Sequence, residues 1–475
     1  MESSSDDLRL ERAPEEGAVS TRFVLAKKNY TQFNNVYKNR INQMRPILRK
    51  EAIRKWGSEE ESLNFMDKII EAEANQGQVC VLIGTLYKEM ELKPSVLDEF
   101  KDYSAAKVEL LPNITSVSDS LILEDDSGRV KLKGMEAITS TLVTGVIVAL
   151  KGCVDNGGIF GVVDWTTADE TLFEDTPGIT KSPEEEMSTK DEKYVLLVSG
   201  LELGSESESS MLPAQLFADF VSGALGGPND IKLASQIVRV IVAGNSIAPL
   251  PSVLGRELRF GVQKDKVDSA RNAKQFDIIL AQLLGSCPVD LMPGPGDPVN
   301  LMMPQQPIHP CLLPHSSRFN TLRLVTNPYE ANIAGVNFLG HSGQPIHDIL
   351  MQTGLCLETV ADTVVMTAQQ AQSDNSRELE ALCNTLRWAH LAPTAPDSLP
   401  CFPIAAVDPF VMTTAPQVLF AGNQPKFASK TVESLGGKST KVVCVPSFKE
   451  TCEVVILNLR TRECSPLSFS VSKTN

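Results

Sequence analysis

At 475 residues the chain is too long for one ordinary hydrophobic core, so two or three domains are expected. Its 42% hydrophobic and 22% charged residues are typical of a globular protein and exclude a disordered or fibrous one. The net charge of -15 argues against a surface devoted to nucleic acid, because phosphate contacts require clustered Lys and Arg side chains.

The chain carries no sign of membrane insertion, of export or of a metal-binding cysteine motif. Its longest apolar stretch near the middle, 142–150, is far shorter than the roughly 20 residues of a membrane helix. The first residues, MESSSDDLRL, lack the basic start and apolar centre of a secretory signal, which favours an intracellular protein. The ten cysteines include no CxxC pair, so we expect reduced core residues and no metal cofactor.

The chain begins with an acidic, polar segment, residues 1–22, for which a disordered tail is expected. The next segment, 23–75, is predicted to be helical because apolar residues recur at intervals of three and four, which places them on one face: Tyr37, Ile41, Met44, Leu48 and Ala52. Within this segment Pro46 is expected to begin a second helix, since proline suits a first turn and breaks a helix interior.

The helical segment is strongly basic. Between Arg22 and Trp56 there are ten Lys and Arg residues and a single acid, Glu51. These side chains form either a solvated surface or a contact with an acidic partner. Whether the basic helix at 30–56 packs internally or faces outward stays open.

Residues 76–167 are predicted to form a small barrel of the OB type. Val79 to Met90 is a strand pattern, and two hairpins follow, turned at 126–128 and at 156–158. Five strands in about 90 residues fit such a barrel. The barrel contains eight Lys and Arg against thirteen Asp and Glu, and Phe160 and Trp165 are interpreted as core residues. We therefore expect little direct nucleic-acid binding.

Residues 168–192 are interpreted as an acidic linker or loop, and an α/β domain is predicted over 193–475. Strand patterns begin at Tyr194, Ile237, Pro288 and Gln417. They alternate with helical patterns at 211–222, 266–286 and 375–390. The last 40 residues are predicted to form consecutive strands that finish one sheet.

Five short segments follow apolar runs in this half: SGLELGS, AGNS, MPGPGDP, LGHSGQ and FAGNQP. The functional crevice of an open α/β sheet lies beyond the carboxyl ends of its strands, so these segments are the candidate site. Their order and spacing resemble those of the metal-binding loops of calcineurin-like phosphoesterases. The resemblance implies an α/β sandwich whose active members hold two metal ions with carboxylates and imidazoles.

The loops depart from that ligand set at most positions. In the fourth loop Ser342 falls at the ligand position, whereas a shift of one residue would place His341 there, so the register at 341/342 stays open. His341 is interpreted as a surface histidine rather than a ligand. Asp297 is the one clear survivor. The remaining positions carry residues other than the expected ligands: Gly200, Glu202, Asn245, Pro295, Gly296, Ser342, Asn423 and Pro425. Glycine and proline side chains donate nothing to a metal, so we expect no catalytic residue and no bound metal.

A barrel followed by an inactivated phosphoesterase domain resembles the B subunits of eukaryotic replicative DNA polymerases, and within them the small subunits of DNA polymerase delta. The resemblance covers nearly the whole chain. It rests on NRINQMRPIL (39–48), RVKLKG (129–134), YVLLVSGLELG (194–204), LMPGPGDPVN (291–300), MPQQPIHPC (303–311), VTNPYEANIAGVNFLG (325–340) and HLAPTAPDSLPCFP (390–403).

This resemblance implies a nuclear, non-catalytic scaffold in DNA replication and repair. Such subunits dock the cysteine-rich C-terminal module of the catalytic subunit and a third subunit whose tail reaches the sliding clamp. In some organisms the same subunit also serves polymerase zeta. Two alternatives stay open: a metal-dependent phosphodiesterase using Glu202, Asp297 and His341, and a single-strand-binding OB protein.

Overall fold

The structure is a computed structural model that describes residues 11–13, 17–25, 32–57, 63–93, 113–174, 192–204, 211–249, 264–354, 376–404 and 407–470. At 264–270 the backbone alone is described. Most of the acidic linker predicted at 168–192 lies outside the described residues, as do residues 1–10 of the predicted tail.

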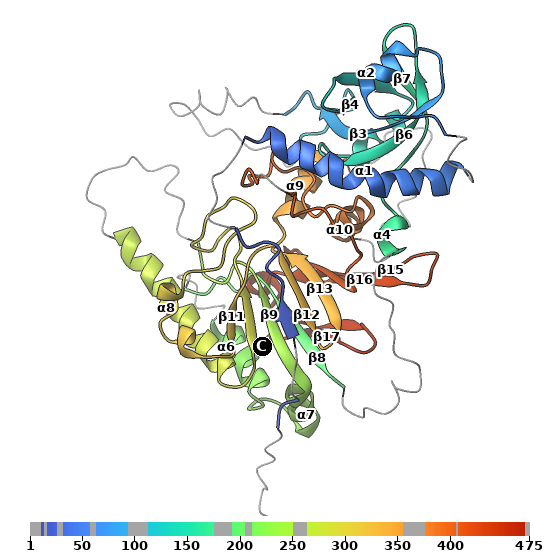
Figure 1. The fold of residues 1–475 in the computed structure, drawn as a ribbon. Helices are drawn as coiled ribbons and strands as arrows, with labels where there is room; N and C mark the ends of the chain where they lie inside the picture. The colour runs from blue at the N-terminus through green and yellow to red at the C-terminus, as the bar shows by residue number, and fades with distance from the viewer. Residues whose placement is uncertain are drawn as a thin grey trace, which may run out of the picture.

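A closed β-barrel forms the upper part of the molecule in Figure 1. Strands pair antiparallel from β3 to β4 to β5 and from β6 to β7, while β5 pairs with β7 in parallel and β3 with β6 closes the ring. Both predicted hairpins and the OB-type connectivity are confirmed. The strands are β2 (Phe65–Met66), β3 (Cys80–Glu89), β4 (Ser120–Glu124), β5 (Arg129–Lys133), β6 (Ile147–Val154) and β7 (Ile159–Thr166), with helix α2 (Ile69–Ala74) and the 3-10 turn η3 (Glu136–Thr141) between them.

Two six-stranded sheets packed face to face form the centre of the other part of the molecule. The first sheet has the order β1 (Gly17–Val19), β12 (Tyr329–Ile333), β13 (Val336–His341), β14 (Val418–Gln424), β16 (Ser439–Pro446) and β15 (Ala428–Glu433). The second has the order β11 (Leu322–Leu324), β10 (Val289–Met292), β9 (Ile237–Ala243), β8 (Tyr194–Val198), β17 (Glu453–Asn458) and β18 (Cys464–Ser468).

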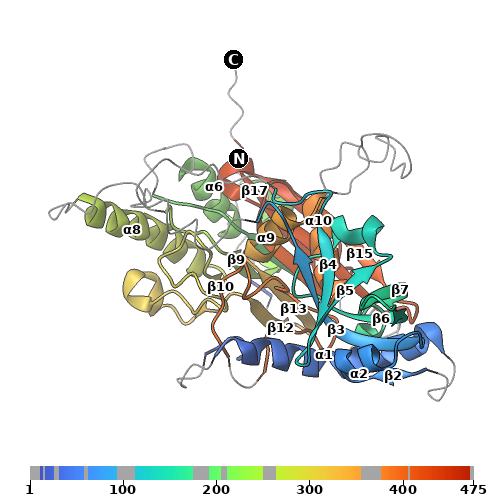
Figure 2. The ribbon, with the colours of Figure 1, turned by 90° about the horizontal axis from the view of Figure 1, so that it is seen from above.

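Helices cover both outer faces of this sandwich, which makes four layers (Figures 1 and 2). Figure 2 shows α6 and α8 on the flank away from the barrel. Helices α6 (Met211–Val221), α7 (Pro228–Gln236) and α8 (Lys264–Leu284) cover the second sheet, together with the short turns η5 (Pro310–Leu312), η6 (Ser316–Arg318) and α11 (Phe448–Thr451). Helices α9 (Gln344–Gln352) and α10 (Arg377–Arg387) cover the first.

The barrel and the outer face of the first sheet share one continuous apolar core. Leu150 of the barrel, Leu382 of α10 and Leu419 of β14 belong to the same buried cluster. Helix α1 (Asn34–Trp56) contributes Met44 and Leu48 to it, both fully buried. The predicted apolar face of this helix is confirmed, with Tyr37 half-buried at its start.

Helix α1 lies between the barrel and the sandwich, so the basic helix packs internally (Figure 1). Arg40 is fully buried, donates from Nε to Asp408 Oδ2 at 2.8 Å and from its Nη atoms to the carbonyls of Pro393 and Ala395. Lys38 and Lys50 stay exposed, and Arg45 is half-buried. At the far end, Glu51 accepts from Thr171 of α4 (Thr171–Glu174).

Three expectations about the elements are wrong. Pro46 lies inside α1 rather than beginning a second helix, because buried residues on both sides hold the helix against the barrel. Residues 17–19 of the predicted tail form β1 against β12, and Arg12 donates to three backbone carbonyls. The final strands are divided between two sheets, because β16 pairs with β14 and β17 pairs with β8.

The described helices and cysteines bear on two further expectations. Among the described residues, no helix combines the length and apolar character of a membrane span. None of the nine cysteines in the described ranges is linked in a disulfide, and five of them are buried. Cys311 is exposed, contrary to the expectation of core residues, and Cys356 lies outside the described residues.

Candidate functional site

The five predicted loops meet at one edge of the sandwich, beyond the carboxyl ends of β8, β9, β10, β13 and β14. Gly200 N donates to Gly244 O at 2.9 Å, and Glu202 N donates to Asn245 O at 3.0 Å. Gly296 N donates to the side chain of Asn245 at 2.8 Å. The two sheets contribute jointly, since Asn423 Nδ2 donates to Ser342 O at 2.7 Å and Asn423 N donates to Ser199 Oγ at 2.8 Å.

Close steric contacts explain two of the glycines. A Cβ on Gly200, where φ is +63°, would lie 2.6 Å from Ser447 Oγ. A Cβ on Gly294 would lie 2.5 Å from Asn245 N. Glu202 and Asn423 also have left-handed backbones, with φ of 41° and 56°. Such conformations are strained for a residue like glutamate and concentrate at functional edges of folds.

Asp297 lies in the loop that follows β10 and is hydrogen-bonded to the loop that follows β9. Its Oδ1 accepts from Ser246 N and Ile247 N, both at 2.9 Å, and its Oδ2 accepts from Gly294 N at 2.8 Å. Burial raises the pKa of Asp297 to about 6, although these backbone N–H groups act in the opposite direction. The carboxylate therefore serves as an acceptor for three backbone donors within the protein.

An amide network that sequence reasoning missed fills the first-sheet side of the edge. Asn327 Nδ2 shares its two N–H groups among Gln305 Oε1 at 2.7 Å, Ser342 Oγ at 2.8 Å and Gln344 Oε1 at 3.1 Å. Gln344 Nε2 donates to Gln305 Oε1 at 2.8 Å. The MPQQPIHPC and VTNPYEANIAGVNFLG motifs contain Gln305 and Asn327, but nothing in either motif indicates that they meet.

His341 is fully buried, so its interpretation as a surface histidine is wrong. His341 is the last residue of β13, and its side chain faces the packed interior, where Nδ1 accepts a hydrogen bond from Gly343 N at 3.1 Å. Its Nε2 has no hydrogen-bond partner among the described residues. Burial lowers the pKa of His341 to about 3, which keeps the imidazole neutral at physiological pH.

The His341→Asn variant is expected to lose stability less steeply on acidification than the unmodified protein. Because the folded pKa of His341 lies below its ordinary value of 6.5, the unfolded chain binds a proton first as the pH falls. Its contribution is therefore present above pH 6.5 and declines below it, by up to about 1.4 kcal/mol per pH unit. Urea denaturation between about pH 7 and pH 4.5 measures both slopes, and parallel slopes would contradict a buried neutral His341.

The residues at the loop edge do not fit a two-metal ligand set. Among the described residues, no three His, Cys, Asp or Glu side chains gather closely enough to hold a metal. Glu202 pairs with Lys449 Nζ at 2.6 Å, and Pro425 is exposed. The carboxylate of Asp297 is taken up by backbone donors, and amides stand at Asn245 and Asn423.

Comparison with known proteins matches both halves of the chain. Residues 32–165 match the family described as DNA polymerase delta subunit OB-fold domain, and residues 195–429 match the family of the B subunits of DNA polymerases alpha and epsilon. A DNA polymerase delta small subunit of Arabidopsis thaliana is 37% identical over 99% of both chains. One of Oryza sativa is 38% identical over 96% of this chain and 97% of its own, and DNA polymerase delta subunit 2 of Drosophila melanogaster is 34% identical over 95% and 97%.

Proposed function

The chain belongs to the family of DNA polymerase delta small subunits, and from that premise we propose that it is a non-catalytic scaffold of the polymerase. The observation that carries the proposal is the chemistry of the five-loop edge. Asp297, the clear survivor of the expected ligand set, accepts three backbone N–H groups and so holds two loops together. Its role is structural closure rather than catalysis.

The architecture supports a phosphoesterase-like origin for the domain proposed at 193–475. Two packed sheets with helices on both outer faces present five strand-end loops at one edge, in the order that the resemblance implies. The left-handed backbones at Glu202, Asn245 and Asn423 support the retention of loop geometry after the ligands were lost. The proposal also includes an OB domain over 76–167, which the closed barrel supports.

Rigid attachment of the barrel supports a scaffolding role. One apolar core continues from the barrel through α1 to α10, and the buried pair of Arg40 with Asp408 ties α1 to the sandwich. Partners that touch both halves would therefore meet a surface of constant shape. We propose that these partners are the C-terminal cysteine-rich module of the catalytic subunit and a third subunit that leads to the sliding clamp, in the nucleus, with polymerase zeta as a further assembly.

Affinity purification of the tagged full chain from nuclear extract tests the proposal. The catalytic subunit of DNA polymerase delta is expected among the co-purified proteins. The Glu202→Gln variant, which alters the loop edge at the rim, is expected to recover the same partners. Recovery of no polymerase subunit by the unmodified chain would contradict the proposed function.

A further inference from the structure

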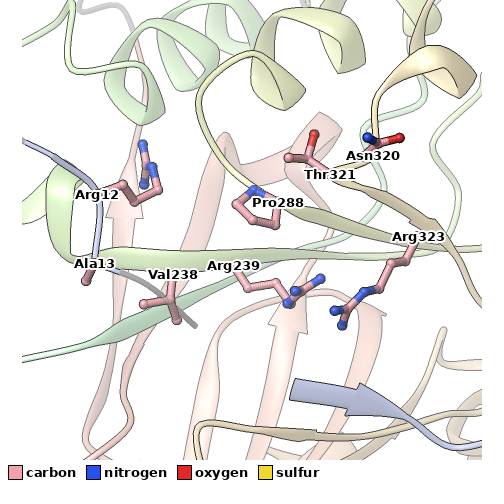
Figure 3. Close-up of a pocket in the computed structure, with 8 residues that line it drawn as sticks. All are labelled: Arg12, Ala13, Val238, Arg239, Pro288, Asn320, Thr321 and Arg323. Carbon is pink, nitrogen blue, oxygen red and sulfur yellow. The ribbon is translucent and has the colours of Figure 1, made fainter. Parts of the chain in front are cut away.

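A cavity of about 300 Å³ lies at the end of the second sheet opposite the five loops (Figure 3). It is lined by Arg239 near the start of β9, Pro288 just before β10, and Thr321 and Arg323 around the start of β11. Strands β9, β10 and β11 run parallel, so their amino ends share one edge and the five-loop site lies at the other. The cavity is therefore separate from the candidate site.

Three guanidinium groups, those of Arg12, Arg239 and Arg323, line this cavity, and the carboxylate of Asp290 lies against two of them. Figure 3 shows Arg239 and Arg323 extending toward one another, with Arg12 across the cavity. Asp290, between them on β10, is fully buried and forms an ion pair with Arg239. Burial raises the pKa of Asp290, whereas Arg239 and Arg323 act to lower it.

The other two arginines bond to neutral acceptors. Arg12 donates to the carbonyls of Val221, Ala234 and Ile237 at 2.6–2.7 Å. Arg323 donates from Nη2 to Gly17 O at 3.2 Å. Carbonyl oxygens orient a guanidinium without cancelling its charge, so the described lining is net positive.

We propose that this cavity binds an oxyanion of the phosphate class, held chiefly by Arg323. The planar guanidinium donates in a fork that matches phosphate oxygens, and a partly buried setting strengthens such charge-assisted bonds. A water molecule takes up about 30 Å³, so the cavity has room for phosphate or pyrophosphate. The described residues of its lining include no aromatic side chain that would stack on a base, which favours the anion alone.

Titration of the full chain with inorganic phosphate and with pyrophosphate, at constant ionic strength, tests this inference. The unmodified protein is expected to bind one of them saturably, seen by calorimetry and by a rise in Tm. Arg323→Ala is expected to weaken binding at least tenfold, because a charge-assisted contact is lost. Arg318→Ala, an exposed arginine on η6 outside the lining, is the matched control and is expected to bind as the unmodified protein does.

A further arm addresses the acids that lie close by in the sequence. Glu15 and Glu16 stand between Ala13, which lines the cavity, and Gly17, which bonds to Arg323. Glu15→Gln with Glu16→Gln is expected to leave phosphate binding unchanged or tighter, because removing negative charge from the protein does not weaken the attraction of Arg323 for an anion. Binding that is absent in the unmodified protein, equal in Arg323→Ala, or lost in the double variant would overturn the proposal.

Discussion

Replacing Arg40 by methionine is expected to lower the free energy of unfolding by about 3–5 kcal/mol. The guanidinium is fully buried between the barrel and the sandwich. Its removal leaves the carboxylate of Asp408 without its ion-pair partner and leaves the carbonyls of Pro393 and Ala395 without their donors. Burial alone would raise the pKa of Asp408, but Arg40 and then His390 outweigh it and hold that pKa below its ordinary value.

Urea denaturation of the full chain measures this effect against a control on the same helix. Lys50→Met removes an exposed charge from α1 and is expected to change stability by no more than about 0.5 kcal/mol. Because much of the Arg40 cost is the unpaired carboxylate, adding Asp408→Asn to Arg40→Met should restore part of the loss. If Arg40→Met loses no more stability than Lys50→Met, the packing of α1 between the barrel and the sandwich does not depend on the pair of Arg40 with Asp408.

Replacing Asp297 by alanine is expected to destabilise the protein by about 3 kcal/mol or more. Three buried backbone N–H groups, on Ser246, Ile247 and Gly294, would lose their acceptor, and each unsatisfied donor costs about 1–3 kcal/mol. Asp297→Asn should cost less, because the amide oxygen keeps the place of Oδ1. Denaturant midpoints and slopes of the three proteins give the comparison.

Glu202→Gln is the matched control for Asp297. The Glu202 carboxylate pairs with the half-exposed Lys449, and such pairs contribute at most about 1 kcal/mol. If Asp297 has a structural role, its replacement should lower the free energy of unfolding strongly, whereas replacement of Glu202 should lower it only slightly. Similar small effects at both positions, with activity lost at both, would instead favour the phosphodiesterase alternative.

The meeting of the five loops could be predicted because parallel strands bring their carboxyl ends to one edge of a sheet. The strand patterns from Tyr194, Ile237 and Gln417 were strong enough to locate β8, β9 and β14. The barrel followed from hairpin signals at Gly128 and Gly158, which are local in sequence. Such local patterns predict structure correctly because each hairpin strand pairs with a strand that is close to it in the sequence.

Contacts between residues far apart in the sequence could not be predicted from such local patterns. Arg40 is one of ten basic residues in its segment, and its partner Asp408 lies 368 residues further on, so no local pattern indicates its burial. The amide network joins Asn327 to Gln305 across 22 residues that include η5, η6 and β11, and no local pattern indicates that the two side chains meet. The burial of His341 depends on packing that forms only when the two sheets meet.

Metal content and nuclease activity of the purified full chain, measured together with Mn²⁺ supplied, test most directly whether the five-loop edge retains phosphoesterase chemistry. No stoichiometric metal is expected, and no exonuclease activity above that of Asp297→Asn. Two equivalents of manganese, iron or zinc per chain, with exonuclease activity that Asp297→Asn abolishes, would contradict a non-catalytic scaffold.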